Sequence, residues 1–118
     1  MISDHILIPW IAEKLGVEIK QNEATGETWW LKNSKEVQKW GNNGLFNPFT
    51  WEWMGKGLGE VMQRGMEFEL TQKWIEIHSQ LVSIELQHRD KMGIPHAFFE
   101  CWYLFECWYQ VEKGEPTP

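Results

Sequence analysis

The stretch MEFELTQKWIEIHSQLVSIELQH, residues 66–88, decides the fold class. Apolar residues partly alternate with polar ones, as in Phe68/Leu70 and Ile75/Ile77, which is typical of half-buried β-strands. We expect three strands within the stretch: 66–71, 73–78 and 81–88. The short links between them favour hairpins, because parallel strands need a dozen or more connecting residues. The stretch therefore predicts antiparallel pairing.

A further hairpin is predicted nearer the N-terminus. Residues 17–20 and 28–32 are short runs rich in β-branched and aromatic side chains, and the polar stretch 21–27 between them contains glycine. Adjacent Trp29 and Trp30 must then point to opposite faces of one strand. Together with the three later strands, this hairpin predicts one antiparallel sheet of about four to five strands.

Helices are predicted near both ends of the chain. The first is expected to begin near Ile8, with Pro9 in its first turn and Gly16 as its C-terminal cap. In the last, Pro95 suits the first turn and Gly114 the stop. The apolar stripe expected in this last helix comprises Phe98, Trp102, Phe105 and Tyr109, widened by Cys101, Leu104, Trp108 and Val111, and its polar side comprises Glu100, Glu106, Gln110 and Lys113.

Two more helical segments are predicted in the middle of the chain. Ser34 is expected to cap a short helical turn through Trp40 that stops at Gly41, and Thr50 to cap a longer helix that ends at Gly65. The expected buried stripe of the longer helix is Trp51, Met54, Leu58, Val61 and Met62. Three glycines, Gly55, Gly57 and Gly59, weaken it by up to ~1 kcal/mol each relative to alanine, and close approach to the sheet is a reason to keep them.

These elements predict an α+β fold in which the sheet packs with an N-terminal, a middle and a C-terminal helix, as a helix-sheet-helix sandwich. A chain of 118 residues suits one hydrophobic core, so residues 1–118 are expected to form a single globular domain. Hydrophobic residues make up 42% of the chain, which is enough apolar surface to argue against global disorder.

Tryptophan is the most unusual feature of the composition, with nine residues. Each indole buries roughly 150–250 Å² and carries an N–H group that needs a partner. Because an interior of this size cannot hide nine indoles, we expect some of them to be exposed for contact with a ligand or a protein. The alternative is that most of them build a bulky core.

The charge balance and the cysteines restrict the partners and the compartment. A formal net charge of −6 argues against duplex nucleic acid as a partner. No apolar run approaches 18 residues and the N-terminus lacks a signal peptide, so we expect a cytoplasmic protein without a membrane partner. Cys101 and Cys107 lie on different faces of the expected helix and should not pair, which fits a reducing compartment.

Motifs for catalysis and metal binding are weak. The run Gly55-Lys56-Gly57-Leu58-Gly59 lacks the spacing of a phosphate-binding loop, so a helix-packing role is favoured. His96 and Glu100 share a helical face, but zinc needs more ligands and a surface pair is favoured. No serine or cysteine stands in a nucleophile context. The sequence therefore predicts a protein that is not an enzyme and has no cofactor or metal.

The loop-to-helix junction from Trp40 to Trp53 is the strongest candidate site. Aromatic rings there can stack on a base, while the helix N-terminus accepts a phosphate or carboxylate and basic side chains add charge. The predicted ligand-binding residues are Trp40, Asn43, Phe46, Phe49, Thr50, Trp51, Trp53, Lys56 and Arg64. The alternative is that these residues fill the core where a long loop crosses the sheet.

Three segments carry a resemblance to a known family: 7–16, with its Ala-Glu-Lys, then Phe49-Thr50 leading into 51–62, and finally 96–113. Together they cover about half of the chain, and they resemble the opening, middle and closing helices of the phage ABA-sandwich family of small phage and prophage accessory proteins. In the last segment, aromatic residues replace the small residues usual in that family. The resemblance implies phage origin and a helix-sheet-helix sandwich, and it transfers no catalytic residue.

Two functions follow as hypotheses. The first is a non-enzymatic binding protein, a counter-defence factor that sequesters a small nucleotide-derived immune signal in the aromatic pocket. The second is a protein-interaction module, whose exposed indoles and acidic face dock on a host or phage protein and inhibit it. A homodimer or higher homo-oligomer is compatible with either function.

Overall fold

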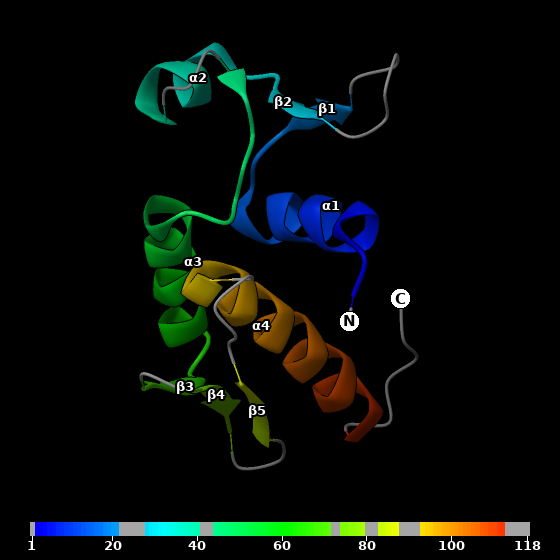
Figure 1. The fold of residues 1–118 in the computed structure, drawn as a ribbon, viewed down its shortest axis with the longest axis vertical. Coiled ribbons are helices and arrows are strands. Elements are labelled where there is room, and N and C mark those ends of the chain that lie inside the picture. Colours follow the sequence, from blue (N-terminus) through cyan, green and yellow to red (C-terminus); the bar gives the residue numbers. More distant parts are fainter. Residues whose placement is uncertain are drawn as a thin grey trace. The chain divides into compact units, whose positions relative to one another are not determined.

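The computed structural model describes residues 2–21, 28–40, 44–71, 74–79, 83–87 and 93–112. The described elements run in the order α1, β1, β2, α2, α3, β3, β4, β5, α4 (Figure 1). Contacts divide the chain into two compact units, Met1–Pro48 and Phe49–Pro118, each of which is described by itself. The single domain expected from the sequence stays a prediction.

Helix α1, Asp4–Leu15, begins earlier than the sequence predicted. Ser3 adopts an extended conformation and its hydroxyl accepts a hydrogen bond from the N–H of His5, so the helix is capped there. Pro9 consequently lies inside the helix, where it removes one backbone donor. Gly16, with φ of 68°, ends the helix as predicted.

The predicted N-terminal hairpin forms. Strand β1, Ile19–Gln21, pairs antiparallel with β2, Trp29–Leu31, in the register Ile19↔Leu31. Helix α2, Ser34–Trp40, follows, and its cap is Asn33 rather than Ser34, because the Asn33 side chain accepts from the N–H of Lys35 at 2.9 Å. The expected stop at Gly41 lies outside the described residues.

The second unit contains the three strands predicted within residues 66–88. Strands β3, Glu67–Leu70, β4, Trp74–His78, and β5, Ser83–Gln87, form an antiparallel sheet in the order β3-β4-β5. The expected strand ends at 73, 81 and 88 lie outside the described residues. Burial alternates along β4, where Ile75 and Ile77 are fully buried and their neighbours are not. The sheet therefore has an apolar inner face and a polar outer face.

Helix α4, Gly93–Glu112, packs on β4 and β5 and begins two residues before the predicted Pro95. Its predicted stop at Gly114 lies outside the described residues. Phe98, Trp102 and Phe105 are buried as predicted. Three predictions for this helix are wrong. Trp108 and Val111, expected in the apolar stripe, are exposed, because burial along α4 ends at Phe105 and does not reach its last turns. Glu100, expected on the polar side, is buried.

Helix α3, Trp51–Gln63, lies beside α4 and contacts β3 (Figure 1). It is capped by Thr50 as predicted, but its buried stripe is Trp53, Met54, Gly57 and Val61. Trp51 and Met62, expected inside, are exposed. The reason is Gly57, where an added Cβ would lie 2.8 Å from Cε1 of Phe98, so this glycine allows α3 to approach α4. The expected close approach is thus to a helix and not to the sheet.

The predicted α+β class is confirmed, whereas the single sheet of four to five strands is wrong. The described strands form two separate antiparallel sheets, of two and three strands. The strands of the first sheet have only three residues each, and outside that hairpin β2 forms one isolated bridge, from Trp30 to Leu45. Among the described residues, no helix combines the length and apolar character needed to cross a bilayer.

Candidate binding site

The start of α3 is capped as the sequence predicted, and one of its two tryptophans, Trp53, is buried. The Thr50 hydroxyl accepts from the N–H of Trp53 at 3.4 Å, and the Trp53 ring is only 4% exposed. Lys56 places its ammonium 5.7 Å from the centre of that ring. Trp51 is the exception, because 61% of it is exposed next to the helix N-terminus. Of this turn, Trp51 alone offers an open aromatic surface.

Phe49 packs against two aromatic rings of α4. Its ring centre lies 4.4 Å from that of His96 and 6.4 Å from that of Phe99. His96 Nδ1 is 3.6 Å from a carboxylate oxygen of Glu100, and both side chains are nearly buried. The predicted surface pair of His96 and Glu100 is therefore largely enclosed. No group of three metal-ligating side chains occurs within the described ranges.

The other predicted aromatic residues belong to the first unit. Trp40 donates its indole N–H to Glu36 at 2.6 Å, with Lys39 5.2 Å from its ring centre. Phe46 is 2% exposed, and its N–H donates to the C=O of Trp29. Asn43 lies outside the described residues. The structure thus brings Phe49, Thr50, Trp51, Trp53 and Lys56 together around the start of α3, and it places Trp40 and Phe46 in the other unit.

Arg64, the last predicted ligand residue, has partners of its own within the second unit. Its Nη1 lies 3.5 Å from Oε1 of Glu106, and its guanidinium carbon lies 5.9 Å from the centre of the Trp102 ring. The same Glu106 oxygen accepts from the Trp102 indole N–H at 3.0 Å. Arg64 therefore ties the C-terminal end of α3 to α4, and its charge is balanced locally.

Helix α3 carries a second apolar face, which sequence analysis assigned to the core. Trp51 and Met62, the latter 63% exposed, lie on it with Gly55, Leu58 and Gly59 between them, because these positions follow helical spacing. A Cβ built on Gly55 or on Gly59 would meet no atom within 4 Å. The face is thus apolar, with Trp51 and Met62 exposed, Leu58 half-buried between them, and no side chain at Gly55 and Gly59.

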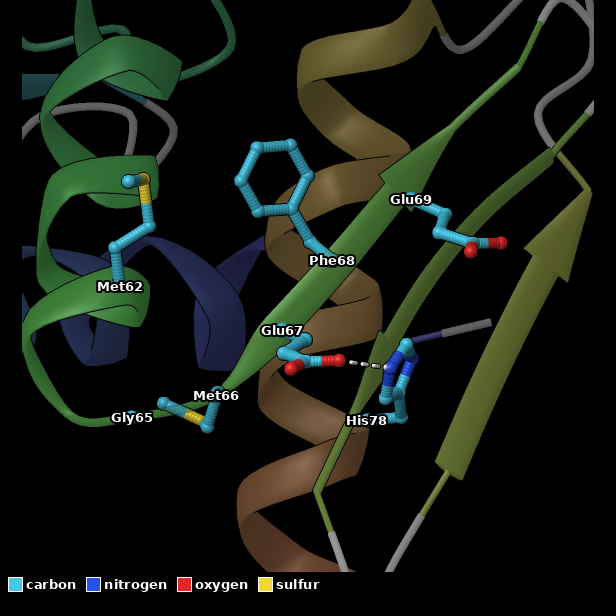
Figure 2. Close-up of a pocket in the computed structure, with 7 residues that line it drawn as sticks. All are labelled: Met62, Gly65, Met66, Glu67, Phe68, Glu69 and His78. Atoms are coloured by element: carbon cyan, nitrogen blue, oxygen red, sulfur yellow. Dashed lines mark hydrogen bonds and ion pairs between the residues drawn. The ribbon is translucent and has the colours of Figure 1, made fainter.

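A hollow of about 480 Å³ lies beside this face, between the end of α3 and β3 (Figure 2). Its lining residues are Met62, Gly65, Met66, Glu67, Phe68, Glu69 and His78. Methionine and phenylalanine side chains form one part of the lining, and two carboxylates with an imidazole form the other. None of these residues belongs to the predicted site.

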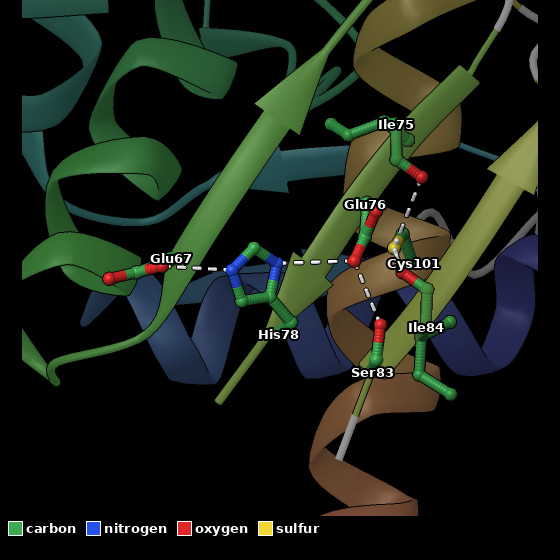
Figure 3. A network of polar contacts seen from close by, with 7 residues as sticks. All are labelled: Glu67, Ile75, Glu76, His78, Ser83, Ile84 and Cys101. Carbon is green, nitrogen blue, oxygen red and sulfur yellow. Dashed lines mark hydrogen bonds and ion pairs between the residues drawn. The ribbon is translucent and has the colours of Figure 1, made fainter. Parts of the chain in front are cut away.

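The polar side of the hollow continues into a network on the outer face of the sheet (Figure 3). His78 Nε2 lies 2.9 Å from Glu67, and its Nδ1 lies 3.2 Å from Glu76. The Ser83 hydroxyl donates to Glu76 at 2.9 Å. The hydrogen bond to Glu67 raises the pKa of His78, against a smaller opposing effect of burial. Sequence reasoning missed these residues, although their alternation with apolar positions in 66–78 signals one shared polar face.

The inner face of the same sheet is closed by α4. The Cys101 thiol lies 3.3 Å from the C=O of Ile84 and 3.9 Å from that of Ile75 (Figure 3). Burial raises the pKa of this thiol to about 12. Cys101 and Cys107 are both free thiols. Cys101 is therefore an inert core residue, and the accessible chemistry of the sheet lies on its outer face.

Comparison with models of known protein families, with curated proteins and with solved structures gives no significant match for this chain. The resemblance to the phage ABA-sandwich family therefore stays a prediction.

Proposed function

We propose that this protein is a non-enzymatic interaction module that docks on a partner protein through the exposed face of α3, defined by Trp51, Gly55, Leu58, Gly59 and Met62. The carrying observation is that α3 is apolar on two faces, of which the chain itself buries one. Exposed tryptophan and methionine are enriched where proteins bind one another. This supports the protein-interaction hypothesis over the nucleotide hypothesis.

The two glycines on this face, Gly55 and Gly59, are a second observation in favour of the proposal. Each costs up to ~1 kcal/mol relative to alanine in a helix interior. Gly57 has a reason to be glycine, because its Cβ would meet Phe98, whereas Gly55 and Gly59 face open space. A partner whose backbone approaches α3 closely gives the chain a reason to keep glycine at both positions. Their cost to the isolated fold is then offset in the complex.

The character of the hollow suits binding of another molecule. Its described lining combines the apolar side chains of Met62, Met66 and Phe68 with the carboxylates of Glu67 and Glu69. Its imidazole, His78, is already engaged by Glu67 and Glu76 on its two ring nitrogens. These groups suit recognition of another molecule by charge and apolar contact.

The test is an affinity capture from bacterial lysate with matched variants. Wild-type protein is expected to retain a stoichiometric partner that Trp51→Ala and Met62→Glu lose. Trp108→Ala is the control, because Trp108 is also exposed, at 54%, and lies on α4. Loss of the partner with Trp108→Ala alone, or its retention by all variants, would contradict the proposal.

A third variant separates binding from folding. Gly55→Leu fills open space on the exposed face and improves helix propensity, so it is expected to raise the melting temperature. The same leucine obstructs close approach of a partner and is expected to abolish capture. A variant that is more stable and still binds fully would show that the partner does not use this face.

The nucleotide hypothesis has one observation in its favour, the exposure of Trp51 beside the α3 N-terminus. Against an aromatic pocket stand the burial of Phe46 and Trp53 and the local pairing of Arg64. Titration with cyclic and ADP-ribose-type nucleotides tests it. Quenching of tryptophan fluorescence that Trp51→Ala removes would favour this second function. Phage origin and a counter-defence role stay predictions.

A further inference from the structure

Strand β3 has one edge paired and the other edge open. It pairs with β4 in the register Glu67↔His78 to Leu70↔Ile75, and the N–H of Thr71 donates to the C=O of Trp74 at 2.9 Å. In an antiparallel ladder, backbone groups point to the partner strand at every second residue. The N–H and C=O groups of Phe68 and Leu70 therefore point away from β4, and in the described part of the chain no strand pairs with that side.

The hollow follows this open edge (Figure 2). Side chains alternate along β3, so Glu67 and Glu69 lie on the outer face and Phe68 and Leu70 on the inner face. Helix α4 packs on β4 and β5, whereas at β3 Leu70 stays exposed and Phe68 is half-buried. An added strand would thus find backbone partners, carboxylates on one face and apolar side chains on the other.

The negative charge of the outer face determines which kind of strand could pair with the open edge of β3. Register places Glu69, Glu76 and Glu85 side by side across the three strands, and Glu67 lies two residues before Glu69 on the same face. A second copy of β3 at this edge would bring glutamates opposite glutamates, which is destabilising. A strand with lysine or arginine on that face would be attracted, and its apolar residues would contact Phe68 and Met62.

We propose that the open edge of β3 accepts an extended segment of a partner protein in which basic residues alternate with apolar ones. Backbone hydrogen bonds to Phe68 and Leu70 provide affinity, and the alternating side chains provide specificity. This site borders the α3 face of the proposed function at Met62, but it uses the backbone of β3 and not Trp51. Trp51→Ala is therefore expected to leave it unchanged.

The probe is a labelled peptide of about ten residues that alternates lysine and valine, with binding to the full chain followed by fluorescence anisotropy. Leu70→Pro removes an outward N–H without touching the ladder to β4, and it is expected to weaken binding at least about tenfold. Leu70→Ala keeps that N–H and is the matched control. Glu69→Gln is expected to weaken binding and to reduce its dependence on salt.

Two further comparisons make the outcomes decisive. Glu85→Gln removes a carboxylate from the same face at the opposite edge strand, and it is expected to change affinity less than Glu69→Gln. A peptide of the same composition without alternation is expected to bind at least about tenfold more weakly. Equal binding of both peptides, or of wild type and Leu70→Pro, would overturn the proposal. Absence of binding would overturn it as well. The glutamates would then serve only to prevent unwanted pairing at the open sheet edge.

Discussion

Gly57 of α3 and Phe98 of α4 are so close that a Cβ on the glycine would lie 2.8 Å from Cε1 of the phenylalanine ring. The ring of Phe99 is almost as near, at 3.0 Å. Both rings are fully buried, so neither has free space into which it could move. This contact sets the distance between the two helices. It also distinguishes Gly57 from Gly55 and Gly59, which face open space.

Replacing the three glycines one at a time is expected to give opposite signs. Gly57→Ala forces a methyl group into the packed rings and should lower the free energy of unfolding by about 1–3 kcal/mol. Gly55→Ala and Gly59→Ala meet no atom within 4 Å, so each should raise it by about 0.5–1 kcal/mol through helix propensity. Urea unfolding of the three variants measures this. A stabilised Gly57→Ala would show that the helices are not in such close contact.

His78 is expected to make stability depend on pH. Its hydrogen bond to Glu67, helped by the charges of Glu76 and Glu69, raises the pKa of His78 above its ordinary 6.5. The folded state therefore binds this proton more tightly than the unfolded state. The resulting stabilisation is fully present below pH 6.5 and is lost as the pH rises through the raised pKa.

The pH prediction is checked by urea unfolding of wild type and His78→Gln from about pH 5 to about pH 8.5. The advantage of wild type over the variant should shrink toward high pH. An NMR titration of the His78 ring provides the direct measurement, with Glu67→Gln expected to lower its pKa. A ring that titrates at or below 6.5 in the wild-type protein would contradict the prediction.

The two thiols are expected to differ strongly in reactivity. Burial raises the pKa of Cys101 from 9.0 to about 12, which lowers its thiolate fraction about a thousandfold near neutral pH. Cys107 is free and partly accessible. Brief treatment with iodoacetamide should modify Cys107 and leave Cys101 intact, as read by mass spectrometry of the digested chain. In denaturant, both should react; similar rates in the native protein would disprove the burial of Cys101.

Local sequence pattern predicted the elements and failed on how they combine. The alternation of Ile75 and Ile77 predicted β4, and short links predicted its antiparallel neighbours. The single sheet was wrong because joining two hairpins depends on contacts between distant segments, which hydrophobic alternation does not encode. The helix caps predicted at Thr50 and Gly16 are confirmed. The cap predicted at Ser34 is instead Asn33, because asparagine is an equally good N-cap.

For the candidate site, too, the sequence predicted local features but not how they combine. Helical spacing cannot tell which of two apolar faces of α3 is buried, so Trp51 was assigned to the buried stripe, although the indoles as a class were expected to be partly exposed. Only the fit of Gly57 against α4 decides between the faces. The hollow beside β3 joins residues from α3, β3 and β4, and their meeting depends on tertiary packing. The expectation that some indoles stay exposed is confirmed by Trp51 and Trp108.

Variants of Arg64 test whether this residue has a structural role or a ligand-binding role. Its guanidinium contacts Glu106 and lies over the ring of Trp102, so Arg64→Ala should lower the free energy of unfolding by about 0.5–1.5 kcal/mol. Arg64→Lys should lose much of the same contribution, because an ammonium lacks the planar surface that stacks on indole. Glu106 keeps the indole N–H of Trp102 in both variants, so the site stays folded. A ligand role would instead leave urea unfolding unchanged and alter only ligand affinity, with Arg64→Lys close to wild type.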